Sequence, residues 1–179
     1  ETPLIVFNTI IILLSAYAIK GGLEVLARTV SIIAPFAIFA FVLVIGLSIG
    51  NMNTGNLLPF LENGFKPVIK ASIVPWAWRG EMSLLAMLLP FLARPLDGRR
   101  AAISAQLFLG LLIGLNSLAI ITIFGPEVER LVFPTFALVQ QVGIAFRLDA
   151  VSIIVWIISL YGKIALFYYA LTLGTAQFF

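Results

Sequence analysis

The stretch that decides the fold is Val68–Leu92, VIKASIVPWAWRGEMSLLAMLLPFL. It is long enough to cross a bilayer, because ~20 mostly apolar residues at ~1.5 Å each span a ~30 Å hydrocarbon core. Pro75 near its centre has no N–H to donate and disfavours helical geometry at Val74. Gly80, between Arg79 and Glu81, adds backbone freedom. Such an interruption survives in a membrane only inside protein or beside a cavity, so the stretch predicts a broken membrane helix of the kind that forms transporter binding sites.

The composition agrees with a membrane location. The mean hydropathy is +1.12, 61% of the residues are hydrophobic and 11% are charged, whereas a soluble domain carries about 25% charged residues. The net charge of +3 is spread over loops without a basic block, so we expect no nucleic-acid partner. The sequence therefore predicts an all-α integral membrane protein embedded in a lipid bilayer.

Two residue types are missing. The chain contains no Cys and no His, which removes disulfides, thiolate nucleophiles, imidazole bases and the usual zinc or haem ligands. We therefore expect no metal, no cofactor and no enzymatic activity. The chain begins at Glu1 without Met and ends in an apolar tail, so we expect it to be a piece of a longer protein.

Run length predicts five membrane spans, at about 3–19, 30–49, 68–92, 101–125 and 150–173. The segment 23–29 (LEVLART) is expected to connect the first two, and 50–66 is expected to be a loop because it is rich in Asn, Gly and Pro. Residues 93–100 (ARPLDGRR) are expected to form a tight basic loop on the cytoplasmic side. Residues 131–146 are too few and too polar to cross and predict a short non-spanning helix.

Local signals refine these spans. Lys20-Gly21-Gly22 is expected to stop the first helix. Pro35 is expected near the start of the second helix, where proline is tolerated. Glu24 and Arg28 stand four residues apart and are expected to form a weak surface ion pair. Gly110-x-x-x-Gly114 is a spacing common in membrane helices, and helix packing is its expected role.

The charged residues of the break are the first candidates for a ligand site. Glu81 lies close to the bilayer midplane, where a charge normally faces a partner or a cavity. It would bind a ligand or a proton, or cap the start of a second half-helix. Arg79 would bind a ligand carboxylate, pair with Glu81 or reach water.

The other residues of the break would shape the pocket. Trp76 and Trp78 are expected either to wall a pocket for an apolar side chain or to pack structurally. Ala77 and Gly80 are small, so backbone N–H groups can approach a carboxylate. We expect the segment from Pro75 onward to unwind through residue 81, which would free carbonyls at one half-helix end and N–H groups at the other.

Lys163 is the charged residue inside the fifth span. It lies 14 residues past Asp149, or ~21 Å along a helix, too deep to reach the interface comfortably. Pairing with Glu81 or another buried acid is one expectation for its ammonium group, and local snorkelling is another.

Several longer motifs occur in order along the chain: GGLEVLAR at 21–28, NLLPFLENGFKPV at 56–68, GPEVERLVFPTFALVQQV at 125–142 and LDAVSIIVWIISLYGKIALFYYAL at 148–171. Together with the broken helix, this order resembles the B subunits of endospore germinant receptors, a branch of the amino acid–polyamine–organocation permease superfamily. The resemblance covers essentially all 179 residues.

The resemblance implies a ten-helix inverted-repeat fold of which this chain holds helices four to eight, with Val68–Leu92 as helix six. Residues 126–149 would then close the site from the non-cytoplasmic side. Family members lie in the spore inner membrane, a bacterial cytoplasmic membrane, with an A subunit and a lipoprotein C subunit. They respond to small nutrients, often amino acids. The resemblance also places Lys163 where sodium-coupled relatives hold a cation, for which its ammonium group would substitute.

Two function classes follow. The first is a nutrient-sensing membrane subunit that binds a small germinant, such as an amino acid, and signals to its partner subunits. The alternative is an amino-acid permease that works by alternating access. A pore-forming or purely structural subunit is less favoured, because nothing in the sequence resembles a selectivity filter or a ring of like charges.

Overall fold

The computed structural model describes residues 3–62, 64–92, 94–143 and 148–179. All regular elements in these ranges are helices. The chain divides into two compact units, one formed by residues 1–44 and 139–179 and the other by residues 45–138. The expected all-helical class is confirmed for these residues.

The first unit is built from α1 (Leu4–Lys20), the greater part of α2 (Gly22–Ser48) and α7 (Leu148–Phe178). The turn between α1 and α2 uses two glycines. The N–H of Gly21 donates to the carbonyl of Ala18 at 3.0 Å, and Gly22 has φ +79°, a conformation that favours glycine. The predicted helix stop at Lys20-Gly21-Gly22 is confirmed.

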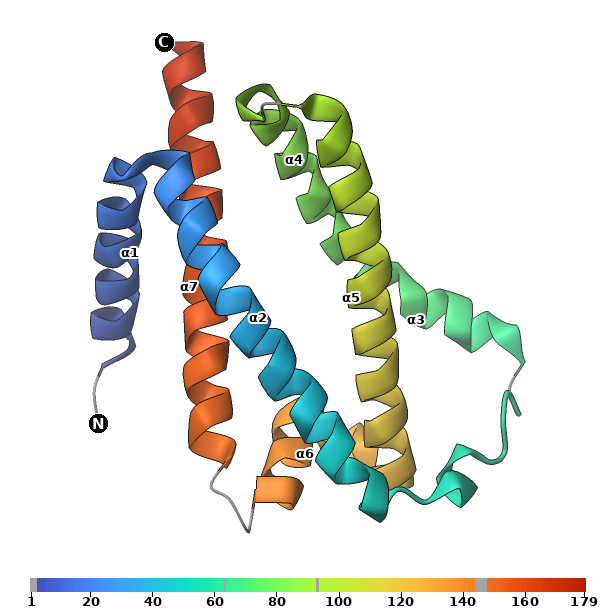
Figure 1. Ribbon diagram of the computed structural model, residues 1–179. Helices are drawn as coiled ribbons and strands as arrows, with labels where there is room; N and C mark the ends of the chain where they lie inside the picture. Colours follow the sequence, from blue (N-terminus) through green and yellow to red (C-terminus); the bar gives the residue numbers. More distant parts are fainter. Residues whose placement is uncertain (1–2, 63, 93, 144–147) are drawn as a thin grey trace. The chain divides into compact units, whose positions relative to one another are not determined.

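Helices α1 and α7 pack side by side (Figure 1). Ser15 on α1 and Ala165 on α7 are fully buried, and the Tyr161 hydroxyl donates to the carbonyl of Leu14 at 3.1 Å. The Ser15 hydroxyl donates to the carbonyl of Ile11 in its own helix at 2.7 Å. Small buried residues let membrane helices approach closely, so these contacts define the interface between the chain's early and late segments.

Helix α2 is longer than the sequence predicted. The expected connector 23–29 is helical and continuous with the span, and Pro35 lies well inside the helix rather than near its start. A proline removes one backbone hydrogen bond, and membrane helices tolerate this loss. The predicted surface ion pair is confirmed: Arg28 Nη2 lies 2.7 Å from Glu24 Oε1, and both side chains are 76% exposed.

The second unit contains most of the shorter elements. They are η1 (Ile49–Asn51), η2 (Thr54–Leu57), α3 (Phe65–Trp78), η3 (Arg79–Met82), α4 (Ser83–Leu88), η4 (Leu89–Phe91), α5 (Pro95–Phe124), η5 (Gly125–Arg130) and the first half of α6 (Pro134–Gly143).

Helix α5 begins earlier than expected. The segment ARPLDGRR was interpreted as a loop, yet Arg94 is the N-cap of α5 and Pro95 its first residue. Proline suits this position because its missing N–H has no helical partner there, and Asp97 in the first turn favours the positive end of the helix dipole. Helix-start signals therefore prevail over turn signals in this segment.

The loop after α2 is attached to the end of α5. The backbone N–H of Asn53 and the Nδ2 of Asn56 both donate to the carbonyl of Thr122, at 3.0 and 2.9 Å. Gly125, which follows α5, has φ +52°, and a Cβ there would lie 3.2 Å from Cγ of Asn56. A glycine is required at this junction for both reasons.

Helix α6 contacts α5 through a polar pair. Asn116 is 9% exposed, and its Nδ2 donates to Thr135 Oγ1 at 3.0 Å. Its Oδ1 is buried without a hydrogen-bond partner among the described residues. Helix α6 has ten residues, or about 15 Å, which is too short to cross a bilayer.

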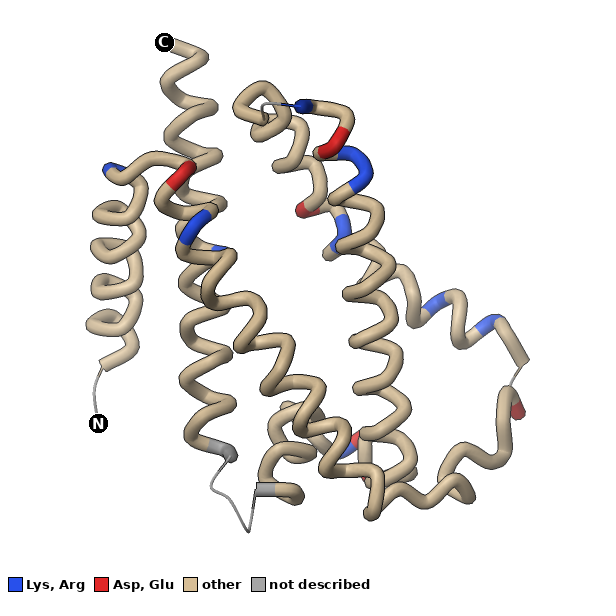
Figure 2. The backbone as a smooth tube through the Cα atoms, in the orientation of Figure 1, with Lys and Arg blue, Asp and Glu red and all other residues tan. Residues whose placement is uncertain are grey.

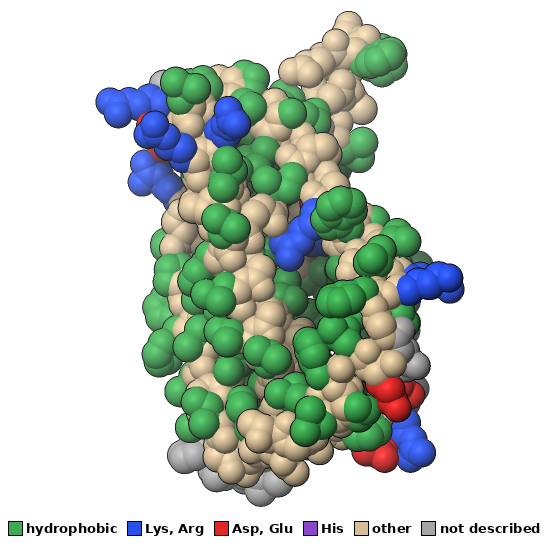
Figure 3. Space-filling view, turned by 90° about the vertical axis from the view of Figure 1, so that its right-hand side faces the viewer, with side chains coloured by type: hydrophobic (Ala, Val, Ile, Leu, Met, Phe, Trp, Pro, Cys, Tyr) green, Lys and Arg blue, Asp and Glu red, His purple; other side chains and the backbone are tan. Residues whose placement is uncertain are grey.

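Among the described residues, three helical stretches are long and apolar enough to cross a membrane: Gly22–Asn51, Pro95–Arg130 and Ala150–Phe178. Between Arg100 and Glu127 the chain carries no charge (Figure 2). Helix α1 is apolar but shorter. Most large hydrophobic side chains are exposed and cover much of the visible surface (Figure 3). A surface of this kind belongs in lipid or against further helices, so the chain is a helical membrane protein.

Candidate functional site

The predicted break appears as a change of helix type after Trp78. The N–H of Arg79 bonds to the carbonyl of Trp76, three residues earlier, whereas an α-helix would use the carbonyl of Pro75. The next four residues form the 3₁₀ helix η3, and α-helix resumes at Ser83. Short 3₁₀ stretches inside a helix often mark hinges.

The expected unwinding from Pro75 to Glu81 is wrong. Pro75 lies inside α3, and the backbone stays right-handed helical through the break, with φ/ψ of −62°/−25° at Trp78, −69°/−13° at Arg79 and −59°/−22° at Met82. Proline removes only its own N–H, so the helix continues past it and tightens four residues later. The break therefore exposes fewer backbone groups than an extended turn would.

A polar chain of contacts joins the break to α5. Nη1 of Arg79 donates to Oε1 of Gln106 at 2.6 Å, and Nε2 of Gln106 donates to Sδ of Met82 at 2.8 Å. Arg79 and Gln106 are both half-buried. Gln106 thus contacts both ends of η3. Its neutral amide holds the guanidinium group of Arg79 in place without neutralising the charge of that group.

Sequence reasoning missed Gln106. It lies in the predicted fourth span, 101–125, and an amide in an apolar membrane segment normally hydrogen-bonds to another helix. That amide was the available signal. Its partner could not be identified from periodicity alone, because the register between α5 and the break depends on how η3 and α4 fold.

The remaining residues of the break are exposed within the second unit. Trp76 and Trp78 are 82% and 72% exposed, and Ala77, Gly80 and Glu81 are exposed as well. A Cβ added at Gly80 would meet nothing within 4 Å, and its φ lies outside the left-handed region. A pocket walled by these indole rings would need a further surface opposite them.

Lys163 lies on α7, in the first unit. Its Nζ is 5.8 Å from the centroid of the Phe167 ring, one helical turn later, a distance at which cation–π attraction operates. The break belongs to the second unit, so pairing between Lys163 and Glu81 remains a prediction.

The described part of the chain holds no group of three acidic side chains placed to bind a metal ion. The site that the described residues form consists of a helix break, an arginine hydrogen-bonded to an amide, a nearby carboxylate and two exposed indole rings.

These features define a helical membrane protein with an interrupted helix that carries charged residues. The chain belongs to the spore germination protein family, which matches residues 1–179.

Individual relatives agree with this assignment. Spore germination protein KB of Bacillus subtilis (strain 168) is 30% identical over 190 residues, covering 100% of this chain and 50% of that protein. Spore germination protein YndE of the same organism is 25% identical, covering 91% of this chain and 46% of that protein. Spore germination protein XB of Bacillus anthracis is 27% identical, covering 93% and 48%. The chain thus spans about half the length of these relatives. No solved structure matches it.

Proposed function

We propose that the chain forms part of a membrane subunit of a spore germinant receptor, which binds a small nutrient at the break and transmits a signal for germination. The family membership and the three long apolar helices support a germination role in a membrane. The observation that carries the ligand proposal is the Arg79–Gln106 contact at the point where α-helix changes to 3₁₀ helix.

Arg79 is suited to bind a carboxylate. A guanidinium group has five N–H donors in a planar fork, and the contact to Gln106 uses a donor of Nη1 alone. Because that partner is neutral, the positive charge is not cancelled by it. The remaining donors can form a charge-assisted pair with the carboxylate of an amino acid.

The neighbouring residues complete the proposed recognition. Glu81, two residues after Arg79, would hold the ammonium group of the same ligand. Trp76 or Trp78 would bound the ligand side chain, and the small residues Ala77 and Gly80 would let the ligand approach the backbone. The role is binding and signalling, with no chemical step.

The wider setting is also part of the proposal. The chain would supply helices four to eight of a ten-helix inverted-repeat fold and would act with an A subunit and a C subunit in the spore inner membrane. Lys163 would stand in that fold where a sodium ion would otherwise be held. The family assignment supports this setting.

An amino-acid permease is the second candidate. A membrane helix interrupted by a short 3₁₀ stretch is the observation in its favour, since discontinuous helices line transport sites. The two candidates differ in net movement of the ligand. A sensor binds without transport, whereas a permease carries the same ligand across.

The test uses purified protein. Thermal unfolding is first measured with each of the twenty amino acids, and a stabilising amino acid is then offered, radiolabelled, to proteoliposomes containing the protein. Stabilisation without uptake above protein-free liposomes supports the sensor. Uptake supports the permease. If no amino acid stabilises the protein, the ligand proposal fails.

A further inference from the structure

An open groove of about 610 Å³ runs between α5 and the segment that follows the break. One wall consists of Met82, Leu85 and Leu92, and the floor is made of small residues of α5. The floor residues recur at helical spacing: Gly98, Ala101, Ala102 and Ala105. The groove is therefore apolar along its length and lies within the second unit.

Charged residues stand at one end of the groove. Arg94 and Asp97 line it there, and Arg99 and Arg100 follow on the same turns of α5. All four are exposed. Three arginines and one aspartate give the first turns of α5 a net charge of +2, although only Arg94 and Asp97 line the groove itself. The surroundings of this end therefore attract an anion, and Arg94 is the positive group that can contact it.

The length of the groove matches one leaflet of a bilayer. Arg94, the N-cap of α5, and Ala105 mark the two ends of the part of this helix that lines it. Eleven residues at 1.5 Å each separate them by ~16 Å, and half of a ~30 Å hydrocarbon core is ~15 Å. An acyl chain entering beside Arg94 would thus end near Ala105.

Gly98 keeps the groove narrow at its charged end. A Cβ at this position would lie 2.6 Å from Cδ1 of Leu92 and 3.1 Å from Cδ2 of Leu89. The side chains after the break therefore approach the backbone of α5 closely there.

We propose that this groove binds one acyl chain of an anionic phospholipid, with the phosphate of the headgroup on Arg94. The apolar wall and floor accept the acyl chain, and Arg94 selects the charge of the headgroup. Met82 takes part in both the groove and the contact with Gln106. A bound lipid would therefore contact the end of η3 and support the break.

The test measures lipid binding to delipidated, detergent-purified protein by thermal unfolding. Dioleoylphosphatidylglycerol is compared with dioleoylphosphatidylcholine, and glycerophosphoglycerol serves as a headgroup without acyl chains. We expect phosphatidylglycerol to bind about fivefold more tightly than phosphatidylcholine, the factor for one basic residue near an anionic lipid. Glycerophosphoglycerol should cause no shift in unfolding temperature.

Two variants separate the headgroup from the acyl chain. Arg94→Gln should abolish the preference for phosphatidylglycerol and leave the affinity for phosphatidylcholine unchanged. Arg94 makes no side-chain cap bond to α5, so the helix start should survive the change. Ala102→Leu, which fills the groove, should lower the affinity for both lipids at least fivefold.

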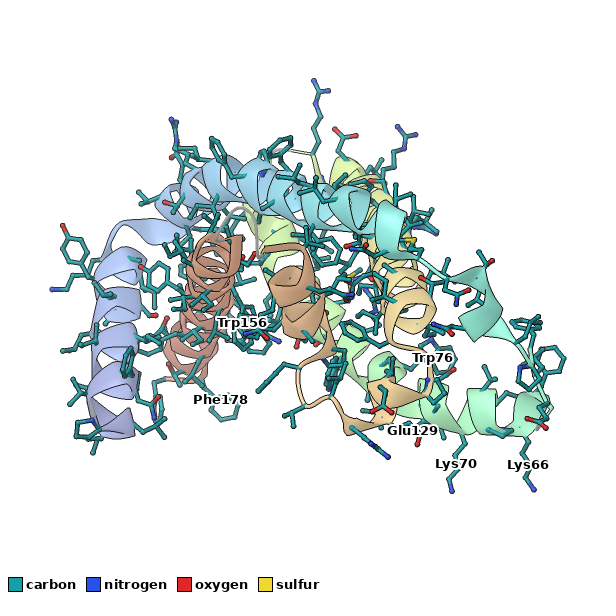
Figure 4. All side chains as sticks on the ribbon, turned by 90° about the horizontal axis from the view of Figure 1, so that it is seen from below. Lys66, Lys70, Trp76, Glu129, Trp156 and Phe178 are labelled. Atoms are coloured by element: carbon teal, nitrogen blue, oxygen red, sulfur yellow. The ribbon has the colours of Figure 1, made fainter. Side chains whose placement is uncertain are left out.

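Matched controls test whether these effects are local. Lys70→Gln removes the same charge from α3, where Lys66 and Lys70 project from one side of the helix (Figure 4). Gly110→Leu adds a side chain to α5 where a Cβ meets nothing within 4 Å. Neither control should change the lipid preference. The proposal is overturned if Arg94→Gln keeps the wild-type preference for phosphatidylglycerol, or if either control variant loses that preference. It is also overturned if glycerophosphoglycerol alone stabilises the protein as much as phosphatidylglycerol does.

Discussion

Replacing Thr135 by valine removes the acceptor that α6 offers to α5. Valine has the same branched shape, so the change deletes the hydroxyl oxygen without opening a cavity. Asn116, which is 9% exposed, then loses the partner of its Nδ2, 3.0 Å away in the wild type. Because its Oδ1 already lacks a partner among the described residues, the whole carboxamide becomes unpaired.

The expected loss of stability differs between the two residues because Asn116 is buried and Thr135 is exposed. Leaving a buried polar group unsatisfied costs ~1–3 kcal/mol, so Thr135→Val should lower the free energy of unfolding by that amount. Asn116→Leu leaves behind only the hydroxyl of Thr135, which is exposed, and also removes the unpaired Oδ1. It should cost less than ~1 kcal/mol. The double variant should lie close to Asn116→Leu.

The assay is a double-mutant cycle on the protein in detergent, with unfolding followed by circular dichroism. The expected coupling between the two positions equals the cost of Thr135→Val, ~1–3 kcal/mol, and its lower end falls within the range measured for polar pairs between membrane helices. Hydrogen exchange adds a local readout, since Thr135→Val should raise exchange in α6 more than in α1. If the two single variants are equally destabilising and their effects add, Asn116 is not a buried amide held by Thr135.

Three further predictions concern other parts of the chain. Gly125→Ala should destabilise the protein by ~1–3 kcal/mol, because φ is +52° and the new Cβ would lie 3.2 Å from Asn56. The control Gly110→Ala should be neutral or stabilising. Unfolding curves that rank the two variants in the opposite order would refute this prediction. Because residues 93–100 are expected on the cytoplasmic side, a cysteine introduced as Asp97→Cys should resist an impermeant thiol reagent added outside, and rapid labelling from outside would reverse the topology. If the Lys163 ammonium replaces a sodium ion, Lys163→Ala should impair the germination response and wild-type ligand binding should be independent of sodium; binding that requires sodium would exclude this role.

Much of the architecture was predictable because hydrophobic run length depends on the bilayer rather than on tertiary detail. The all-helical class and the turn at Gly21–Gly22 follow from composition and local chemistry. Two of the errors concern prolines. Pro35 was expected near the start of the second helix and Pro75 at the start of an unwound turn, yet each lies inside a helix, because a helix tolerates the loss of one backbone hydrogen bond where its neighbours compensate.

The candidate site was only partly predictable. The residues of the break were recognisable from their charge and from Gly80, but the change of helix type begins at Arg79 rather than at Pro75. The contact with Gln106 spans 27 positions of sequence. Such a contact depends on the register between two elements, which no local pattern specifies.

The central claim is that Arg79, oriented by Gln106, binds the carboxylate of the ligand. The most direct measurement is calorimetric titration of the protein with a stabilising amino acid and with its carboxamide analogue. Wild type should bind the carboxylate more tightly by roughly 10- to 150-fold, the factor for a charged hydrogen bond of ~1.5–3 kcal/mol. Arg79→Gln should bind both compounds equally weakly, and the control Lys66→Gln should behave as wild type. If Arg79→Gln retains both the affinity and the preference for the carboxylate, the ligand does not bind at the break.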